Sequence, residues 1–148
     1  MRTSLFPCAF GCLLLVAATA ASAADPAGTW LTIDDETGKE RSIVRIEEVN
    51  GELQGMVEKL FDQPGDDPQH LCRKCTGERK DRPIVGMTIL WGLKKKGDDW
   101  SGGEILDPMN GKTYRCKMTL SEDGQKLDVR GYIGISLIGR TQTWHRAQ

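Results

Sequence analysis

Alternation of apolar and polar side chains is the dominant pattern along this chain. In the run 113–120, Tyr114, Cys116, Met118 and Leu120 fall on one face, and charged or hydroxyl side chains fall on the other. A period of two is typical of a β-strand with one buried face. The same pattern, in a stronger or weaker form, predicts further strands at 29–33, 41–49, 52–61, 84–93, 100–106, 127–133 and 140–146.

Turn signals separate these runs at short intervals. Asn50-Gly51 and Asn110-Gly111 are Asn-Gly pairs, which favour tight hairpins because both central residues take positive φ. No stretch has sustained helical periodicity, although a short helical turn fits 135–138. Consecutive strands joined by tight turns predict an all-β protein, an antiparallel up-and-down barrel of about eight strands. A sandwich of two sheets is the alternative.

One long polar segment interrupts this rhythm. Residues 62–82 contain two prolines, two glycines, four aspartates, and the pair Cys72 and Cys75. Loops of this length inside a compact domain are usually functional or tied down by special contacts. We therefore expect a single long loop between two strands of the barrel.

The N-terminal segment has the features of a secretory signal. Arg2 precedes an apolar run, and small residues end it at Ala21-Ser22-Ala23. The run is shorter than the ~20 residues that a membrane-spanning helix needs, so we predict no stable membrane insertion. Residues 1–23 are thus predicted to be a cleaved signal peptide and residues 24–148 a single domain. The expected location after cleavage near Ala23 is periplasmic or secreted.

Charge and motifs exclude several classes of function. The 148-residue chain has 20 Lys and Arg against 21 Asp and Glu, which indicates no nucleic-acid partner. Its two histidines, His70 and His145, belong to no recognised metal or catalytic motif. Nucleophile-elbow, phosphate-loop and dinucleotide motifs are also missing from the sequence. We therefore predict no enzymatic activity, no cofactor and no metal.

The cysteines leave several alternatives open. Two of the five leave with the signal, so Cys72, Cys75 and Cys116 remain. An oxidising compartment favours a Cys72–Cys75 disulfide that closes a very short loop. The alternatives are a bond from this loop to Cys116, a metal site that includes His70, and a redox-active C-x-x-C. The second C-x-x-C of a structural zinc site and the βαβ setting of a redox motif are both missing.

Several short segments together resemble one known group of proteins. Gly28-Thr29-Trp30 opens the first strand, as G-x-W does in lipocalin-like (calycin) barrels. Further segments of this kind are RPIVG at 82–86, WSGG at 100–103, DPMNGKTY at 107–114, RGYIG at 130–134 and GRTQTW at 139–144. Across nearly all of 24–148, the chain resembles a family of uncharacterised secreted bacterial proteins with a lipocalin-like barrel.

This resemblance implies a periplasmic barrel with a ligand cavity. It implies no enzymatic activity. In lipocalins an arginine of the last strand covers the early tryptophan and closes one end of the barrel. The resemblance therefore implies that Arg140 or Arg146 packs over Trp30.

The function that the sequence favours is binding of a small, mostly apolar ligand inside the barrel. The inward faces of the first and sixth predicted strands supply the candidate lining residues. The alternatives are a protein-interaction module that uses loop 62–82, and a metal or redox site in that loop. The candidate ligand-binding residues are Trp30, Tyr114, Cys116, Met118 and Leu120.

Overall fold

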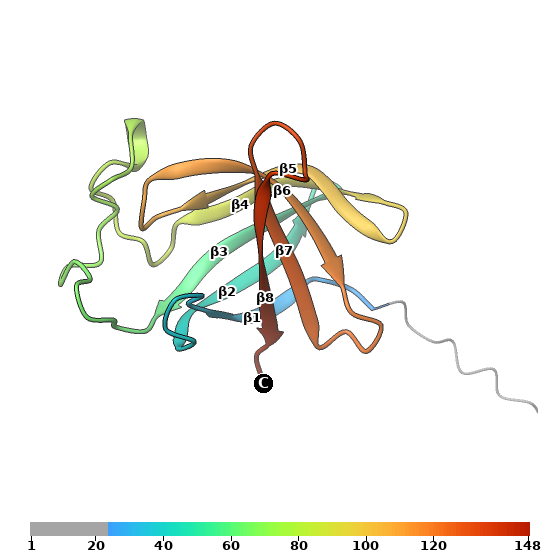
Figure 1. Ribbon diagram of the computed structural model, residues 1–148, viewed down its shortest axis with the longest axis horizontal. Coiled ribbons are helices and arrows are strands. Elements are labelled where there is room, and N and C mark those ends of the chain that lie inside the picture. Colours follow the sequence, from blue (N-terminus) through green and yellow to red (C-terminus); the bar gives the residue numbers. More distant parts are fainter. Residues whose placement is uncertain (1–23) are drawn as a thin grey trace, which may run out of the picture.

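The computed structural model describes residues 24–148, and the predicted signal peptide 1–23 lies outside the described residues. The described chain forms a closed barrel of eight strands, each paired antiparallel with the next, and β8 paired with β1 (Figure 1). This confirms the predicted up-and-down barrel and excludes the sandwich. The strands are β1 (Gly28–Ile33), β2 (Glu40–Val49), β3 (Glu52–Leu60), β4 (Thr88–Lys96), β5 (Asp99–Asp107), β6 (Lys112–Leu120), β7 (Lys126–Tyr132) and β8 (Gly139–Arg146).

Glycine allows the barrel wall to curve tightly where β5 crosses β4. A Cβ atom at Gly103 would lie 2.3 Å from the carbonyl oxygen of Trp91 and 2.6 Å from Cγ of Leu93. A side chain at this position would push the two strands apart, and the pairing of β5 with β6 is irregular in the same place. Only glycine permits this close approach of two backbones.

β4 begins later than the sequence predicts. The run 84–93 predicted a strand from residue 84, but β4 starts at Thr88 and extends to Lys96. Ile84 belongs to the preceding loop, where its backbone N–H donates to the carbonyl of His70, and Leu71 pairs with Pro83. The loop thus buries this apolar side chain in the way that a strand would.

Two short local structures lie outside the strands. Residues 135–138, where a short helical turn was expected, form a single hydrogen-bonded turn closed by the Ile138 N–H on the Ile135 carbonyl at 3.1 Å. A short 3-10 helix that was not predicted, η1 (Gly77–Arg79), occurs within the long loop. In residues 24–148, no helix is long and apolar enough to cross a membrane.

The core fills one half of the barrel. The half near the β2–β3, β4–β5 and β6–β7 turns contains buried side chains from seven strands, β1 to β7. Trp30 closes this end and donates its indole N–H to the Pro26 carbonyl at 2.8 Å. The other members of this packed half are Ile46, Leu53, Leu93, Trp100, Met118 and Leu127.

Candidate functional site

The opposite half of the barrel is hollow. A cavity of about 830 Å³ opens between the β1–β2, β3–β4, β5–β6 and β7–β8 connections. This volume lies within the range of roughly 300–1,000 Å³ that is typical of small-molecule sites. Its inner wall is apolar and includes Val57, Ile89, Ile105, Leu106, Val129 and Trp144.

Hydrogen-bonding groups are interspersed in the cavity wall and mouth. The Thr32 and Ser42 hydroxyl groups lie 2.7 Å apart, and Asn110 donates to the Tyr114 hydroxyl at 2.9 Å. Gln63 donates its side-chain N–H to the Glu40 carbonyl at 3.0 Å, whereas its Oε1 is buried and accepts no hydrogen bond from the described residues. Its burial keeps this oxygen out of contact with the cavity, so the hydroxyl groups of the wall are the groups that can pair with a ligand.

An ion pair fixes the long loop at the mouth of the cavity. The Arg41 guanidinium donates to both carboxylate oxygens of Asp66, at 2.7 and 2.9 Å, and both side chains are only 16% exposed. Asp66 also accepts the Gln63 backbone N–H at 2.9 Å. These hydrogen bonds, Arg41 first, hold the pKa of Asp66 below its ordinary value. The start of the loop is therefore fastened to β2 beside Gln63.

Acid should loosen this attachment. Because the pKa of Asp66 is lower in the folded than in the unfolded state, its contribution is fully present above the ordinary value of about 4. It is lost as pH falls from there through the lowered pKa. We expect hydrogen exchange of the Gln63 amide, corrected for intrinsic pH dependence, to lose protection over this interval.

Two variants make this prediction specific. Asp66→Asn should remove the pH dependence of Gln63 protection, because the side chain no longer titrates. Asp123→Asn, in the β6–β7 turn, is the matched control, since the pKa of Asp123 is also lowered but by Ser121. An unchanged pH dependence in Asp66→Asn would contradict the role given to this carboxylate.

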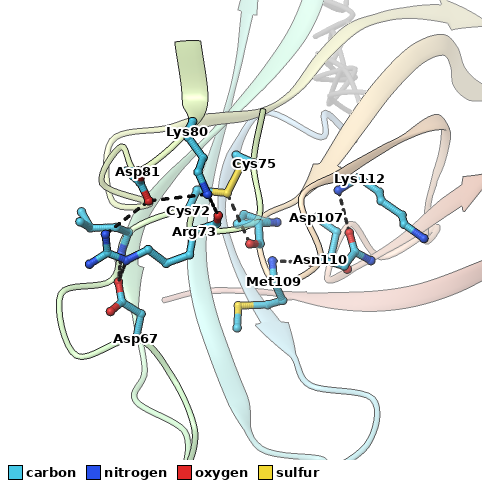
Figure 2. Close-up of a disulfide and its surroundings, with 12 residues drawn as sticks. Asp67, Cys72, Arg73, Cys75, Lys80, Asp81, Asp107, Met109, Asn110 and Lys112 are labelled. Carbon is cyan, nitrogen blue, oxygen red and sulfur yellow. Dashed lines mark hydrogen bonds and ion pairs between the residues drawn. A yellow bond between two sulfur atoms is a disulfide. The ribbon is translucent and has the colours of Figure 1, made fainter. Parts of the chain in front are cut away.

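The Cys72–Cys75 disulfide predicted from the sequence is present in the long loop (Figure 2). Both cysteines are buried, and Cys72 Sγ lies 3.4 Å from the Pro108 carbonyl oxygen. A Cβ atom at Gly111, whose φ is +72°, would lie 2.0 Å from the Lys74 carbonyl oxygen. The disulfide segment therefore packs directly on the β5–β6 turn, at the rim of the cavity.

Polar contacts stabilise the rest of the loop. Arg73 bridges Asp67 and Asp81 at 3.1 and 3.3 Å (Figure 2). Arg79 of η1 lies over the Trp91 ring, 4.5 Å from its centroid, and attaches the loop to the outer wall of β4. Cation–π pairs of this kind contribute about 0.5–1 kcal/mol at exposed sites. The role of loop 62–82 in docking a partner stays a prediction.

Within residues 24–148, Cys116 forms no disulfide. It is free and fully buried on β6, and burial raises the pKa of its thiol to about 12. The alternative of a bond from the loop to Cys116 is therefore wrong. The metal alternative also fails within residues 24–148, because the two loop thiols are consumed by the disulfide and no group of three ligating side chains gathers there.

Thiol counting should reproduce this arrangement. For the barrel of residues 24–148, Ellman's reagent at pH 8 should detect no thiol in the native state, because Cys116 is buried. It should detect one thiol in denaturant and three after reduction, since the disulfide holds the other two. A thiol that reacts rapidly in the native protein would contradict the burial of Cys116. Three reactive thiols in denaturant without reduction would contradict the disulfide.

The structure separates the five candidate lining residues into two groups. Tyr114 lines the cavity. Trp30, Cys116 and Met118 are fully buried in the packed half, and Leu120 packs against the same core. These four side chains do not line the cavity, so a role for them in binding a ligand stays a prediction. Sequence reasoning missed the residues that do form the wall, such as Val57, Ile105, Val129 and Trp144, although each lies on an inward strand face.

The two candidate closing arginines have different positions. The Arg146 guanidinium lies over the Trp30 ring, 4.3 Å from its centroid, at the packed end. It also donates to the carbonyls of Gly124, Ala27 and Asp25. Arg140 lies at the other end, where it lines the cavity and pairs with Asp35 at 3.0 Å.

A closed eight-stranded barrel, hollow at one end and sealed at the other by a tryptophan under an arginine, is a lipocalin-like fold. A solved structure with a TM-score of 0.72 is described as "Protein HP1028 from the human pathogen Helicobacter pylori belongs to the lipocalin family"; it is 21% identical, with 84% of each chain covered. The family described as "Uncharacterized protein conserved in bacteria (DUF2147)" matches residues 28–146, and the chain belongs to it. None of the curated proteins matches this sequence.

Proposed function

We propose that this protein binds a small, mostly apolar ligand in the barrel cavity and performs no chemistry on it. The observation that carries the proposal is the cavity of about 830 Å³ with its apolar inner wall. Each Å² of apolar ligand surface removed from water contributes roughly 25 cal/mol. A ligand that fills this cavity therefore gains affinity chiefly by leaving water, without charged groups deep inside.

The cavity mouth favours a ligand with an uncharged polar end. The hydroxyl groups of Thr32, Ser42 and Tyr114 belong to residues of the cavity lining. A carboxylate is disfavoured there, because acidic side chains outnumber basic ones along the lining. The charged lining residues are Asp34, Asp35, Glu36, Asp66 and Asp107 against Lys39, Arg41 and Arg140.

We also propose an extracytoplasmic location. The Cys72–Cys75 disulfide supports it, because structural disulfides persist in oxidising compartments. The predicted signal peptide would deliver the barrel there, and the ligand is then to be sought outside the cytoplasm.

Titration with a neutral apolar fluorophore, N-phenyl-1-naphthylamine, tests the proposal. Saturable binding is expected, together with a change in tryptophan emission, because Trp144 lines the cavity. Trp144→Phe keeps the wall apolar and should retain probe binding while it loses most of that emission change. Absence of saturable binding would overturn the proposal.

A further inference from the structure

The β7–β8 connection concentrates exposed aliphatic side chains. Ile133, Ile135, Leu137 and Ile138 are 67%, 59%, 85% and 67% exposed. In Figure 1 this segment projects from the barrel beyond the end of β7, at the top of the view. We call residues 133–138 the apolar loop. Isolated exposed aliphatic residues are common, but a cluster of this kind marks an interaction surface.

Arginine side chains from the barrel wall donate hydrogen bonds to backbone carbonyls of the apolar loop. Arg130 donates to the carbonyls of Ser136 and Leu137 at 2.6 and 3.3 Å, and Arg115 approaches the Gly134 carbonyl at 3.5 Å. The Ile133 N–H also donates to the Ile138 carbonyl across the loop. Backbone groups that are already paired lower the cost of placing a segment in an apolar medium.

The same arginines give the surroundings of the loop a positive charge. Within residues 24–148, neither Arg115 nor Arg130 forms an ion pair. The nearest acidic residues are Glu104, directly opposite Arg115 in strand register, and Asp128 on β7. Neither carboxylate pairs with the two arginines: Glu104 accepts from Trp91, and Asp128 accepts from a threonine hydroxyl. The acidic hairpin 34–36 reaches β8, where Asp35 is neutralised by its ion pair with Arg140, whereas Arg115 and Arg130 extend from β6 and β7.

Aliphatic side chains that insert among lipid chains and guanidinium groups without a carboxylate partner together favour binding to anionic phospholipids. We propose that the apolar loop inserts peripherally into an anionic phospholipid surface, with the β6–β7 side of the barrel facing the headgroups. Ile133 and Ile138 also line the cavity, so this surface adjoins the cavity mouth. A second copy of the chain would match the aliphatic cluster but would not use the arginines. The docking surface does not depend on a ligand in the cavity.

Vesicle sedimentation tests the proposal on the barrel of residues 24–148. Vesicles of phosphatidylcholine with about a third phosphatidylglycerol should bind the protein, and pure phosphatidylcholine should bind it much less. Leu137→Asp should lower the partition coefficient at least about tenfold, because the variant loses an inserted aliphatic group. Arg115→Gln and Arg130→Gln should each lower it about fivefold.

Val49→Asp is the matched control, because Val49 is an exposed aliphatic residue at the packed end of the barrel. It should bind anionic vesicles as the wild type does. Equal binding to both vesicle types, an equal loss in Val49→Asp, or no vesicle binding would each overturn the proposal. A dimer abolished by Leu137→Asp, without vesicle binding, would assign the loop to a second copy and overturn it too. Titration of the cavity probe without vesicles tests the proposed ligand site separately.

Discussion

Replacement of Trp30 by alanine is expected to lower the free energy of unfolding by about 3–5 kcal/mol. The Trp30 side chain is fully buried, its indole N–H donates to the Pro26 carbonyl, and Arg146 covers its ring. The variant loses this burial, the hydrogen bond and the stacking together, and a void remains at the end of the barrel. Urea denaturation followed by circular dichroism measures the difference.

A graded series shows which contacts carry the effect. Trp30→Phe retains a ring for Arg146 to cover but loses the hydrogen bond to Pro26, so it should be destabilised less than the alanine variant. Trp91→Ala is the control for loss of a tryptophan side chain. It should cost less stability than Trp30→Ala, since Trp91 lies half-buried on the outer wall. Equal losses in Trp30→Ala and Trp91→Ala would contradict the role of Trp30 as the closing side chain.

Replacement of Gly131 by leucine is expected to weaken binding of an apolar ligand by roughly 5- to 150-fold, the equivalent of 1–3 kcal/mol of overpacking. Gly131 lines the cavity. A Cβ atom there would meet Tyr114 Cβ at 3.5 Å and Ile105 Cγ2 at 3.6 Å, which are ordinary contacts. The backbone therefore accepts a side chain, and the added atoms take up ligand space. Titration with N-phenyl-1-naphthylamine measures the change.

Thr113→Leu is the matched control for this variant. It adds aliphatic atoms to the exposed face of β6, outside the cavity lining. Its affinity for the probe should equal that of the wild type. If Gly131→Leu also binds the probe with unchanged affinity and keeps its thermal stability, the probe lies elsewhere and the cavity is not the site.

Alternation along the strands was sufficient to predict the barrel but not its hollow half. Tyr114 and Met118 lie on the same face of β6, four residues apart, and sequence alone treats them alike. In the structure Tyr114 lines the cavity and Met118 is buried in the packed half. A period of two predicts which face of a strand points inward. Whether the barrel interior is packed or hollow at a given height depends on the side chains of the other strands.

For a related reason, the sequence pattern did not reveal the structure of two loop segments. Ile84 resembled the first residue of a strand, because an apolar side chain buried by a loop has the same sequence pattern as one buried by a sheet. Residues 135–138 were predicted as a short helical turn, but the sequence did not show that their aliphatic side chains are exposed. The Cys72–Cys75 disulfide was predictable, because the spacing and the expected compartment both favour it.

The central claim is that the cavity holds a small, mostly apolar molecule. The most direct test is a native mass spectrum of the protein purified from the cells that produce it, compared with a denaturing spectrum of the same sample. The proposed function predicts an added mass of a small molecule that is released on denaturation and is less abundant in Gly131→Leu. Identical masses in both spectra, together with no saturable binding of the apolar probe, would contradict it.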